Sequence, residues 1–195
     1  MFAKTVALAA LAATASATIR GGSSSNKAPS VPAPKVNVYW GQTGSTRLRD
    51  YCQSSGFEYV TIGFVNNSPE QDASGLDYPG TNFGAHCAAE VYEKDGKKSK
   101  LLNGCTMIAA DIPVCQALGK KVLLSIGGAW QDGTDYTVST PAAGRYFANF
   151  LWGAFGPWSA AYQGPRPFDF GGKHVSVDGF DFDIEHKFGE CTPFP

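Results

Sequence analysis

The chain has 195 residues, a formal net charge of -1 and an isoelectric point near 6.3. This length suits one sizeable domain, and the weak charge excludes a strongly basic surface for nucleic acid or for an anionic membrane. Glycine is abundant at 23 residues and aromatic residues make up 13% of the chain, so tight turns and stacking surfaces are both available.

The first 34 residues predict a leader and a linker ahead of the folded part. Lys4 precedes an apolar run over 6–13, and a small-x-small pattern follows at 15–17. This is typical of a secretory signal peptide over 1–17; a short membrane anchor is the alternative, but the run is too short to span a bilayer. Residues 18–34 are rich in Gly, Ser, Pro and Ala and predict a flexible linker. We therefore expect a secreted, extracellular protein.

Strands and helices alternate along the rest of the chain. Strands are predicted at 35–42, 58–67, 120–128 and 174–185, and helices at 46–56, 105–119 and 140–155. The last helix opens with Thr140 as N-cap and Pro141 in the first turn, whereas Pro113 predicts a kink or a late start in the second. For the Gly-, Pro- and charge-rich stretch at 68–103 no element is predicted.

This order predicts parallel βαβ units and an α/β fold. The strands after the first are apolar on both faces, as expected when helices cover a sheet. The residues after the first strand contain neither G-x-G-x-x-G nor G-x-x-x-x-G-K, which argues against a nucleotide-binding fold. The pattern alone leaves open whether the sheet closes into a barrel.

The last strand carries acidic side chains on one face. In "VDGFDFDIEH" (177–186), Asp181, Asp183 and Glu185 stand two residues apart and therefore point the same way. The opposite face belongs to apolar residues that we expect to meet helices: Phe180, Phe182 and Ile184. Asp178 falls on that other face unless a bulge at Gly179 shifts the alternation.

Closely spaced carboxylates indicate acid–base chemistry. They resist simultaneous ionisation, so one of them tends to keep its proton near neutral pH. A protonated carboxylic acid is what the leaving oxygen of a glycosidic bond needs. A metal site or a solvated acidic edge is the structural alternative, but solvated edges are not interleaved with Phe and Ile, and calcium favours loop oxygens. The pattern therefore favours catalytic carboxylates.

Cysteine and histidine positions argue against a metal site. A secreted chain forms disulfides, and an odd number of cysteines leaves one over; they are Cys52, Cys87, Cys105, Cys115 and Cys191. No Cys-x-x-Cys occurs and the three histidines are scattered. We expect neither zinc nor any other cofactor.

The acidic strand resembles the signature of glycoside hydrolase family 18. "DGFDFDIE" (178–185) matches Asp-x-x-Asp-x-Asp-x-Glu, and "LLSIGG" (123–128) resembles the family's Ser-x-Gly-Gly element. "VYWGQ", "YVTIGFVN", "NFGAHC" and "DFDIEH" are similar to segments of the hevamine-like class III chitinases of plants and fungi. The resemblance runs from about residue 36 to 186 and implies a (β/α)8 barrel that cleaves chitin.

The resemblance also implies a role for each acid. Glu185 would protonate the glycosidic oxygen and later activate water, while the acetamide of the substrate attacks the anomeric carbon in a retaining, substrate-assisted reaction. Asp183 would orient that acetamide, Asp181 would hold Asp183 and share its proton, and Asp178 would be a buried support.

Substrate-binding positions and disulfides carry over in the same way. The residues implied to bind substrate are Tyr39, Gln42, Phe64, Asn82, Gly127 and Gly128. Core packing is the alternative for Tyr39 and Phe64, and turn formation is the alternative for the glycines. The implied disulfides are Cys52–Cys115 and Cys87–Cys105, which leaves Cys191 single.

The sequence thus predicts a secreted, monomeric chitinase that acts on chitin or chitin oligosaccharides. Two alternatives remain: a non-catalytic chitin-binding lectin or inhibitor on the same fold, and an endo-β-N-acetylglucosaminidase, which shares the acidic signature. Only four βα units are recognisable, whereas a typical barrel needs eight and about 250 residues. We therefore expect residues 35–195 to form the N-terminal half of a family 18 domain, with poor hydrolysis by this chain alone.

Overall fold

The computed structural model describes residues 35–130 and 134–185. The predicted signal peptide, the linker and Cys191 lie outside these residues. In chain order the elements are β1 (Asn37–Trp40), α1 (Leu48–Cys52), β2 (Tyr59–Asn67), η1 (Pro69–Gln71), β3 (Gly80–Thr81), η2 (Gly84–His86), β4 (Val91–Lys94), β5 (Lys97–Leu102), α2 (Thr106–Ala117), β6 (Lys121–Ala129), α3 (Pro141–Phe155) and β7 (Gly179–Glu185). Among the described helices, none has the length and apolar character of a membrane span.

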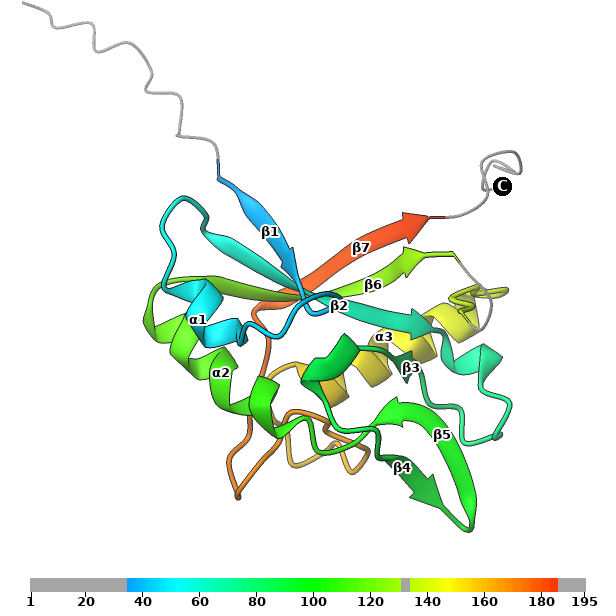
Figure 1. Cartoon of the computed structure of the whole chain (residues 1–195). Helices are drawn as coiled ribbons and strands as arrows, with labels where there is room; N and C mark the ends of the chain where they lie inside the picture. The colour runs from blue at the N-terminus through cyan, green and yellow to red at the C-terminus, as the bar shows by residue number, and fades with distance from the viewer. Residues whose placement is uncertain (1–34, 131–133, 186–195) are drawn as a thin grey trace, which may run out of the picture. The chain divides into compact units, whose positions relative to one another are not determined.

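Four parallel strands form the main sheet in the order β1-β2-β6-β7, and β3 pairs antiparallel with the end of β2 (Figure 1). The predicted strands and helices are all present, and the βαβ order is confirmed. Helix α1 is shorter than predicted, at five residues. Helix α2 runs on through Pro113, while Thr140 caps α3 by accepting the Ala143 amide at 3.1 Å, as predicted.

The two faces of the sheet differ more than the sequence suggested. Val60 and Ile62 of β2, with Val122 and Leu124 of β6, are fully buried in the hydrophobic core. Two alternate positions on the same strands carry buried hydroxyl groups, because Thr61 and Ser125 are 0% exposed. The expectation of two apolar faces therefore holds only in part: one face packs on helices, and the other places these two hydroxyls beside Leu123 and glycines.

A β-hairpin stands where no element was predicted. Strands β4 and β5 pair antiparallel and are joined at Asp95-Gly96, both of which have positive φ angles, 52° and 73°. Such a two-residue turn requires left-handed backbone at both positions, which Asp-Gly tolerates well. The disulfide Cys87–Cys105 brackets the hairpin, with a Cα separation of 4.6 Å.

The second disulfide joins the first two helices. Cys52 of α1 is bonded to Cys115 of α2, with their Cα atoms 5.3 Å apart. Both pairings implied by the family resemblance are thus present in the structure.

The outer face of β7 is only partly covered. Phe180 packs beside Trp152 of α3, with ring centroids 6.5 Å apart. Phe182 and Ile184 are 73% and 52% exposed, contrary to the expectation that this face meets helices. The reason is that α3 reaches only the first part of β7 and no helix follows β7 within the described residues.

Candidate active site

The three acids of β7 line up against β6 in regular register. Asp181 pairs with Ser125, Asp183 with Gly127 and Glu185 with Ala129. Because the strands are parallel, this series runs toward the carboxyl end of the sheet, where catalytic residues of β/α barrels lie. The predicted alternation on this strand therefore translates directly into a line of carboxylates that ends at the edge of the sheet.

Asp181 is fixed by two hydroxyl groups from neighbouring strands. Its Oδ2 accepts hydrogen bonds from the Tyr39 hydroxyl at 2.6 Å and from Ser125 Oγ at 2.8 Å. Burial raises the pKa of Tyr39 to about 12, and the hydrogen bond to Asp181 and the charges of Asp181 and Asp183 act in the same direction. Tyr39 therefore stays a hydrogen-bond donor at any ordinary pH.

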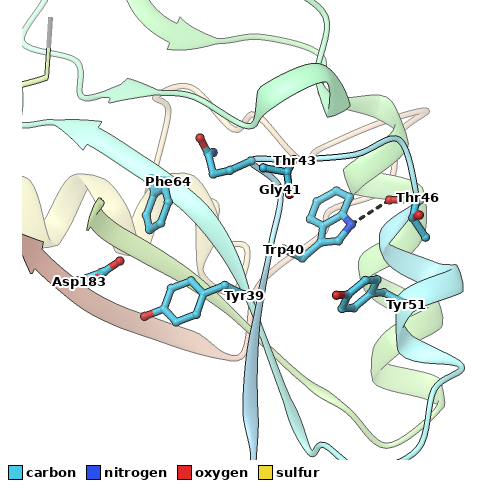
Figure 2. A pocket seen from close by; sticks show the side chains of 9 residues that line it. Tyr39, Trp40, Gly41, Thr43, Thr46, Tyr51, Phe64 and Asp183 are labelled. Carbon is cyan, nitrogen blue, oxygen red and sulfur yellow. Dashed lines mark hydrogen bonds between the residues drawn. The ribbon is translucent and has the colours of Figure 1, made fainter. Parts of the chain in front are cut away.

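Asp183 faces a cavity of about 390 Å³ that is lined mainly by the end of β1 and the loop after it (Figure 2). The rings of Tyr39 and Phe64 flank this space with centroids 6.1 Å apart, and the Asp183 carboxyl points between them. Trp40, whose indole donates to Thr46 O at 2.9 Å, closes the far side. A carboxylate between aromatic walls can orient a flat polar group such as an amide.

Glu185 faces a second cavity of about 260 Å³. Gln42 and Phe64 line both cavities, so the two are adjacent across these residues. The remaining lining residues of the second cavity are Asn66, Asn82, Gly127, Gly128, Ala129 and Thr134. The structure thus gathers all six predicted substrate-binding residues around Asp183 and Glu185.

Gln42 joins three segments beneath this site. Its Nε2 donates to Gly63 O and to Asn82 O, both at 2.8 Å. Phe64 and Asn82 exchange backbone hydrogen bonds of 2.8 and 2.9 Å. The amide nitrogen of Gln42 is thereby occupied by the protein itself, which gives this residue a positioning role for Phe64 and Asn82.

Gly127 and Gly128 line the Glu185 cavity, and their lack of side chains also allows close packing against β6. A Cβ on Gly127 would lie 1.9 Å from the Asp183 carbonyl oxygen, and one on Gly128 would lie 2.9 Å from the Phe64 ring. Both also have positive φ, 121° and 85°. Their lack of side chains therefore lets β7 and Phe64 approach β6 closely, in addition to the predicted approach of a sugar.

Asp178 stands apart from the other three acids. It precedes β7 and binds the amino end of β6, accepting from Lys121 Nζ at 2.8 Å, Val122 N at 3.0 Å and Gln116 Nε2 at 3.0 Å. Its side chain is 19% exposed and is absent from both cavities. It supports the strand register, although it is less buried than predicted.

Sequence reasoning missed two residues near the acids. Ser125 could have been noticed as a lone hydroxyl in the apolar run "VLLSIGG", because a buried hydroxyl requires a partner. Tyr136, on the loop between β6 and α3, donates its hydroxyl to Gly128 O at 3.2 Å, one residue before the Ala129 that pairs with Glu185. No local sequence pattern indicates that contact.

The carboxyl groups at the cavities suit acid–base chemistry. Within 35–130 and 134–185, no three Cys, His, Asp or Glu side chains gather in a way that could hold a metal ion. Three carboxyl groups are arranged along β7. Glu185 lines the smaller cavity, Asp183 points between two aromatic rings, and Asp181 accepts hydrogen bonds from two hydroxyl groups.

Comparisons with known proteins agree with this picture. The family model described as "Glycosyl hydrolases family 18" matches residues 35–192. Endochitinase A of Aspergillus niger is 50% identical over 163 residues, which cover 80% of this chain and 12% of that protein. Endochitinase A1 of Aspergillus fumigatus is 49% identical over 159 residues, covering 80% of this chain and 18% of the relative.

Solved structures share the fold. A chitinase from Ipomoea carnea superposes with a TM-score of 0.56 at 26% identity, covering 78% of this chain and 47% of that one. The xylanase and alpha-amylase inhibitor protein XAIP-II from Scadoxus multiflorus gives 0.55 at 27% identity, with 79% and 46% covered. The chain thus spans less than half of these solved proteins, and under a fifth of the two fungal relatives.

Proposed function

Because the chain belongs to glycosyl hydrolase family 18, with a barrel-type α/β fold, we propose that it supplies the acid machinery of a chitinase. The observation that carries this proposal is the line of Asp181, Asp183 and Glu185 along one strand, with the last two opening into adjacent cavities. The fungal relatives named endochitinase support chitin or chitin oligosaccharides as the substrate. We also propose, from the sequence of residues 1–34, that the protein is secreted.

The proposed reaction retains configuration and uses the substrate as nucleophile. Glu185 donates its proton to the glycosidic oxygen as the bond to the anomeric carbon breaks, and the N-acetyl oxygen of the same sugar forms the new bond to that carbon. Asp183 stabilises the positive charge on the resulting ring, and Asp181 holds Asp183 in place. Water, deprotonated by Glu185, then opens the ring. Because the substrate supplies the nucleophile, no second carboxylate is needed across the cleft. All the acid groups can therefore lie on one strand.

A binding protein without activity is the second candidate, since XAIP-II is an inhibitor on the same fold. It is not favoured here, because all three acids are present and Asp181 keeps both of its hydroxyl donors. An endo-β-N-acetylglucosaminidase is disfavoured by the chitinase-like segments and by the endochitinase relatives.

The function is tested by binding and hydrolysis together. We expect a chitin tetramer to bind the 195-residue chain, seen as a change in Trp40 fluorescence, while a high-mannose glycopeptide does not bind. For hydrolysis, residues 35–185 are joined to the family 18 sequence that follows the matched segment in the Aspergillus niger relative. Reducing ends released from chitin oligomers by this hybrid support a chitinase; binding without hydrolysis supports a lectin.

The isolated 195-residue chain is expected to hydrolyse chitin poorly. Glu185 is itself exposed in the structure. Water near the acids raises the local dielectric and weakens charge stabilisation in the transition state. We further propose that the described strands form the first four βα units of the barrel. Rapid release of reducing ends by the isolated chain would contradict the first expectation.

A further inference from the structure

A third cavity, of about 430 Å³, lies beside the two that hold Asp183 and Glu185. Asn66 and Asn82 line both this cavity and that of Glu185. Since the Glu185 cavity also shares lining residues with the Asp183 cavity, the three follow one another as one groove with Glu185 in the middle. A chain of sugars that binds at the acids can therefore continue into the third cavity.

The hairpin of β4 and β5 supplies part of the lining of this third cavity, which we call the hairpin cavity. Val91 of β4 and Ser99, Lys100 and Leu102 of β5 line it. The rest of the lining comes from the end of β2, from β3 and from the residues that lead from β3 to β4. The stretch for which the sequence predicted no element thus borders the groove.

The hairpin is held against the body of the protein on two sides. Leu102 N of β5 donates to Thr81 Oγ1 of β3 at 3.0 Å, and Figure 1 shows the hairpin next to β3. The disulfide Cys87–Cys105 ties together the segments that enter and leave the hairpin. A wall that is fixed in this way binds a ligand without the entropy cost of ordering a loop.

The polar side chains of the hairpin cavity are mostly neutral amides and hydroxyls. An amide side chain both donates and accepts hydrogen bonds, which suits the hydroxyl and acetamide groups of a sugar. Asn82 Oδ1 accepts from Gly84 N at 2.9 Å, and this contact fixes the plane of the Asn82 amide at the border with the Glu185 cavity. The neutral lining residues with such groups are Asn66, Asn67, Thr81, Asn82 and Ser99.

Lys100 carries the only formal charge among the described residues that line the hairpin cavity. The other two cavities each contain a carboxyl group instead, from Asp183 and from Glu185. A sugar unit that has lost its acetyl group carries an ammonium ion, which the carboxylates attract and Lys100 repels. The hairpin cavity is therefore the part of the groove where a deacetylated unit meets a like charge, and such repulsion is a source of specificity.

We propose that the hairpin cavity binds a further N-acetylglucosamine unit of the chain that occupies the acid cavities, and that Lys100 selects against a deacetylated unit there. The proposal rests on the proposed function for the identity of the sugar chain. It concerns binding, so it is tested without catalysis.

The selectivity is tested by calorimetry with the 195-residue chain at about pH 6, where a sugar amine is protonated. The probes are a fully acetylated chitin hexamer and two hexamers with a single free amine, one at each terminal sugar. One of these two should bind wild type about twofold to fivefold more weakly than the acetylated hexamer, the value of one exposed charge contact. Lys100→Gln should remove this difference. Lys94→Gln is the control and should keep it, because Lys94 is exposed on the same hairpin but does not line the cavity.

The site itself is tested by chain length. We expect the acetylated hexamer to bind wild type about threefold to tenfold more tightly than the trimer, the value of one ordinary hydrogen bond. Ala89→Trp places a large ring at an exposed lining position and should abolish this gain. Lys94→Trp, which adds the same ring to the hairpin outside the cavity, should keep the gain.

A length gain that survives Ala89→Trp, or a probe difference that survives Lys100→Gln, would overturn the proposal. Equal affinity of wild type for all three hexamers would overturn it too. If the hybrid chain hydrolyses chitin oligomers without these differences, the proposal fails and the proposed function stands. If the differences appear but the hybrid does not hydrolyse, the enzyme function fails and the hairpin cavity stands as a sugar-binding site.

Discussion

The two ends of the β6–β7 pair hold acids of the same motif in opposite settings. At the amino end, Asp178 meets a lysine, an amide side chain and a backbone amide, so its charge is matched. Further toward the carboxyl end, Asp181 meets only neutral groups among the described contacts, the hydroxyls of Tyr39 and Ser125. A matched carboxylate stabilises the fold, whereas acids left without a described cation partner remain available for chemistry.

This contrast separates the first Asp of Asp-x-x-Asp-x-Asp-x-Glu from the other three positions. Both ends depend on the same strand register, because Val122 N binds Asp178 while Ser125 binds Asp181. The hydrogen bond at the amino end holds β7 in register with β6, and the position of the acids toward the carboxyl end depends on that register. Substitutions at the amino end should therefore change stability, and those at the carboxyl end should change turnover.

The largest effect is expected from Glu185→Gln. Loss of a general acid costs about 10²–10⁴-fold in kcat, while the amide keeps the size of the side chain and leaves chitin-oligomer binding nearly unchanged. Reducing-end release and calorimetric binding by the hybrid chain measure the two quantities. Asp178→Asn in the same hybrid is the control and should retain most of its turnover; equal losses in both variants would remove the distinction between the two ends.

Gly127→Ala should be the most damaging substitution for stability. Its Cβ would lie 1.9 Å from the Asp183 carbonyl oxygen, so β7 would have to move. We expect a loss of about 3 kcal/mol or more in the free energy of unfolding, measured by urea denaturation. Gly119→Ala is the matched control, because Gly119 also has positive φ, 79°, with nothing within 4 Å; it should lose only about 1–2 kcal/mol.

Asp178→Asn should change how stability depends on pH. Burial alone would raise the pKa of Asp178, but hydrogen bonds from Lys121, Val122 and Gln116 lower it overall. A carboxyl whose folded pKa is depressed stabilises the fold above its unfolded pKa, about 3.9, and loses this contribution as the pH falls toward the folded value.

The difference in unfolding free energy between wild type and Asp178→Asn should therefore be constant above about pH 5 and shrink below about pH 4. Because Lys121 is 60% exposed, screening keeps the plateau small, about 1 kcal/mol. Denaturation at several pH values measures this difference. Asp181→Asn, which has no ion pair among the described contacts, is the comparison; a similar acid-dependent difference there would contradict the assignment of roles.

The smallest effect concerns Tyr39. Its pKa is raised to about 12 by burial first and by Asp181 second. In Asp181→Asn the negative charge is gone while burial remains, so we expect the pKa of Tyr39 to fall but to stay above the ordinary value near 10. Tyrosinate absorbance after a rapid pH jump follows the change, and an unchanged pKa would mean that Asp181 does not act on Tyr39.

Local patterns in the sequence determined much of this protein. Period-two alternation placed Asp181, Asp183 and Glu185 on one face, and Thr140 marked the start of α3, because both depend only on neighbouring residues. The Asp95-Gly96 turn carried an equally local signal for the hairpin, which the composition of its surroundings obscured. The family signature supplied the disulfide pairs.

Only the tertiary structure decided the contacts between distant segments. Tyr39 and Asp181 are 142 positions apart, and their 2.6 Å hydrogen bond depends on four strands lying in one register. The same holds for the hydrogen bonds of Gln42 to Gly63 O and Asn82 O and for the exposure of Phe182. Such contacts are set by how elements pack, and a one-residue slip would undo them all, so no pattern within a single segment can encode them.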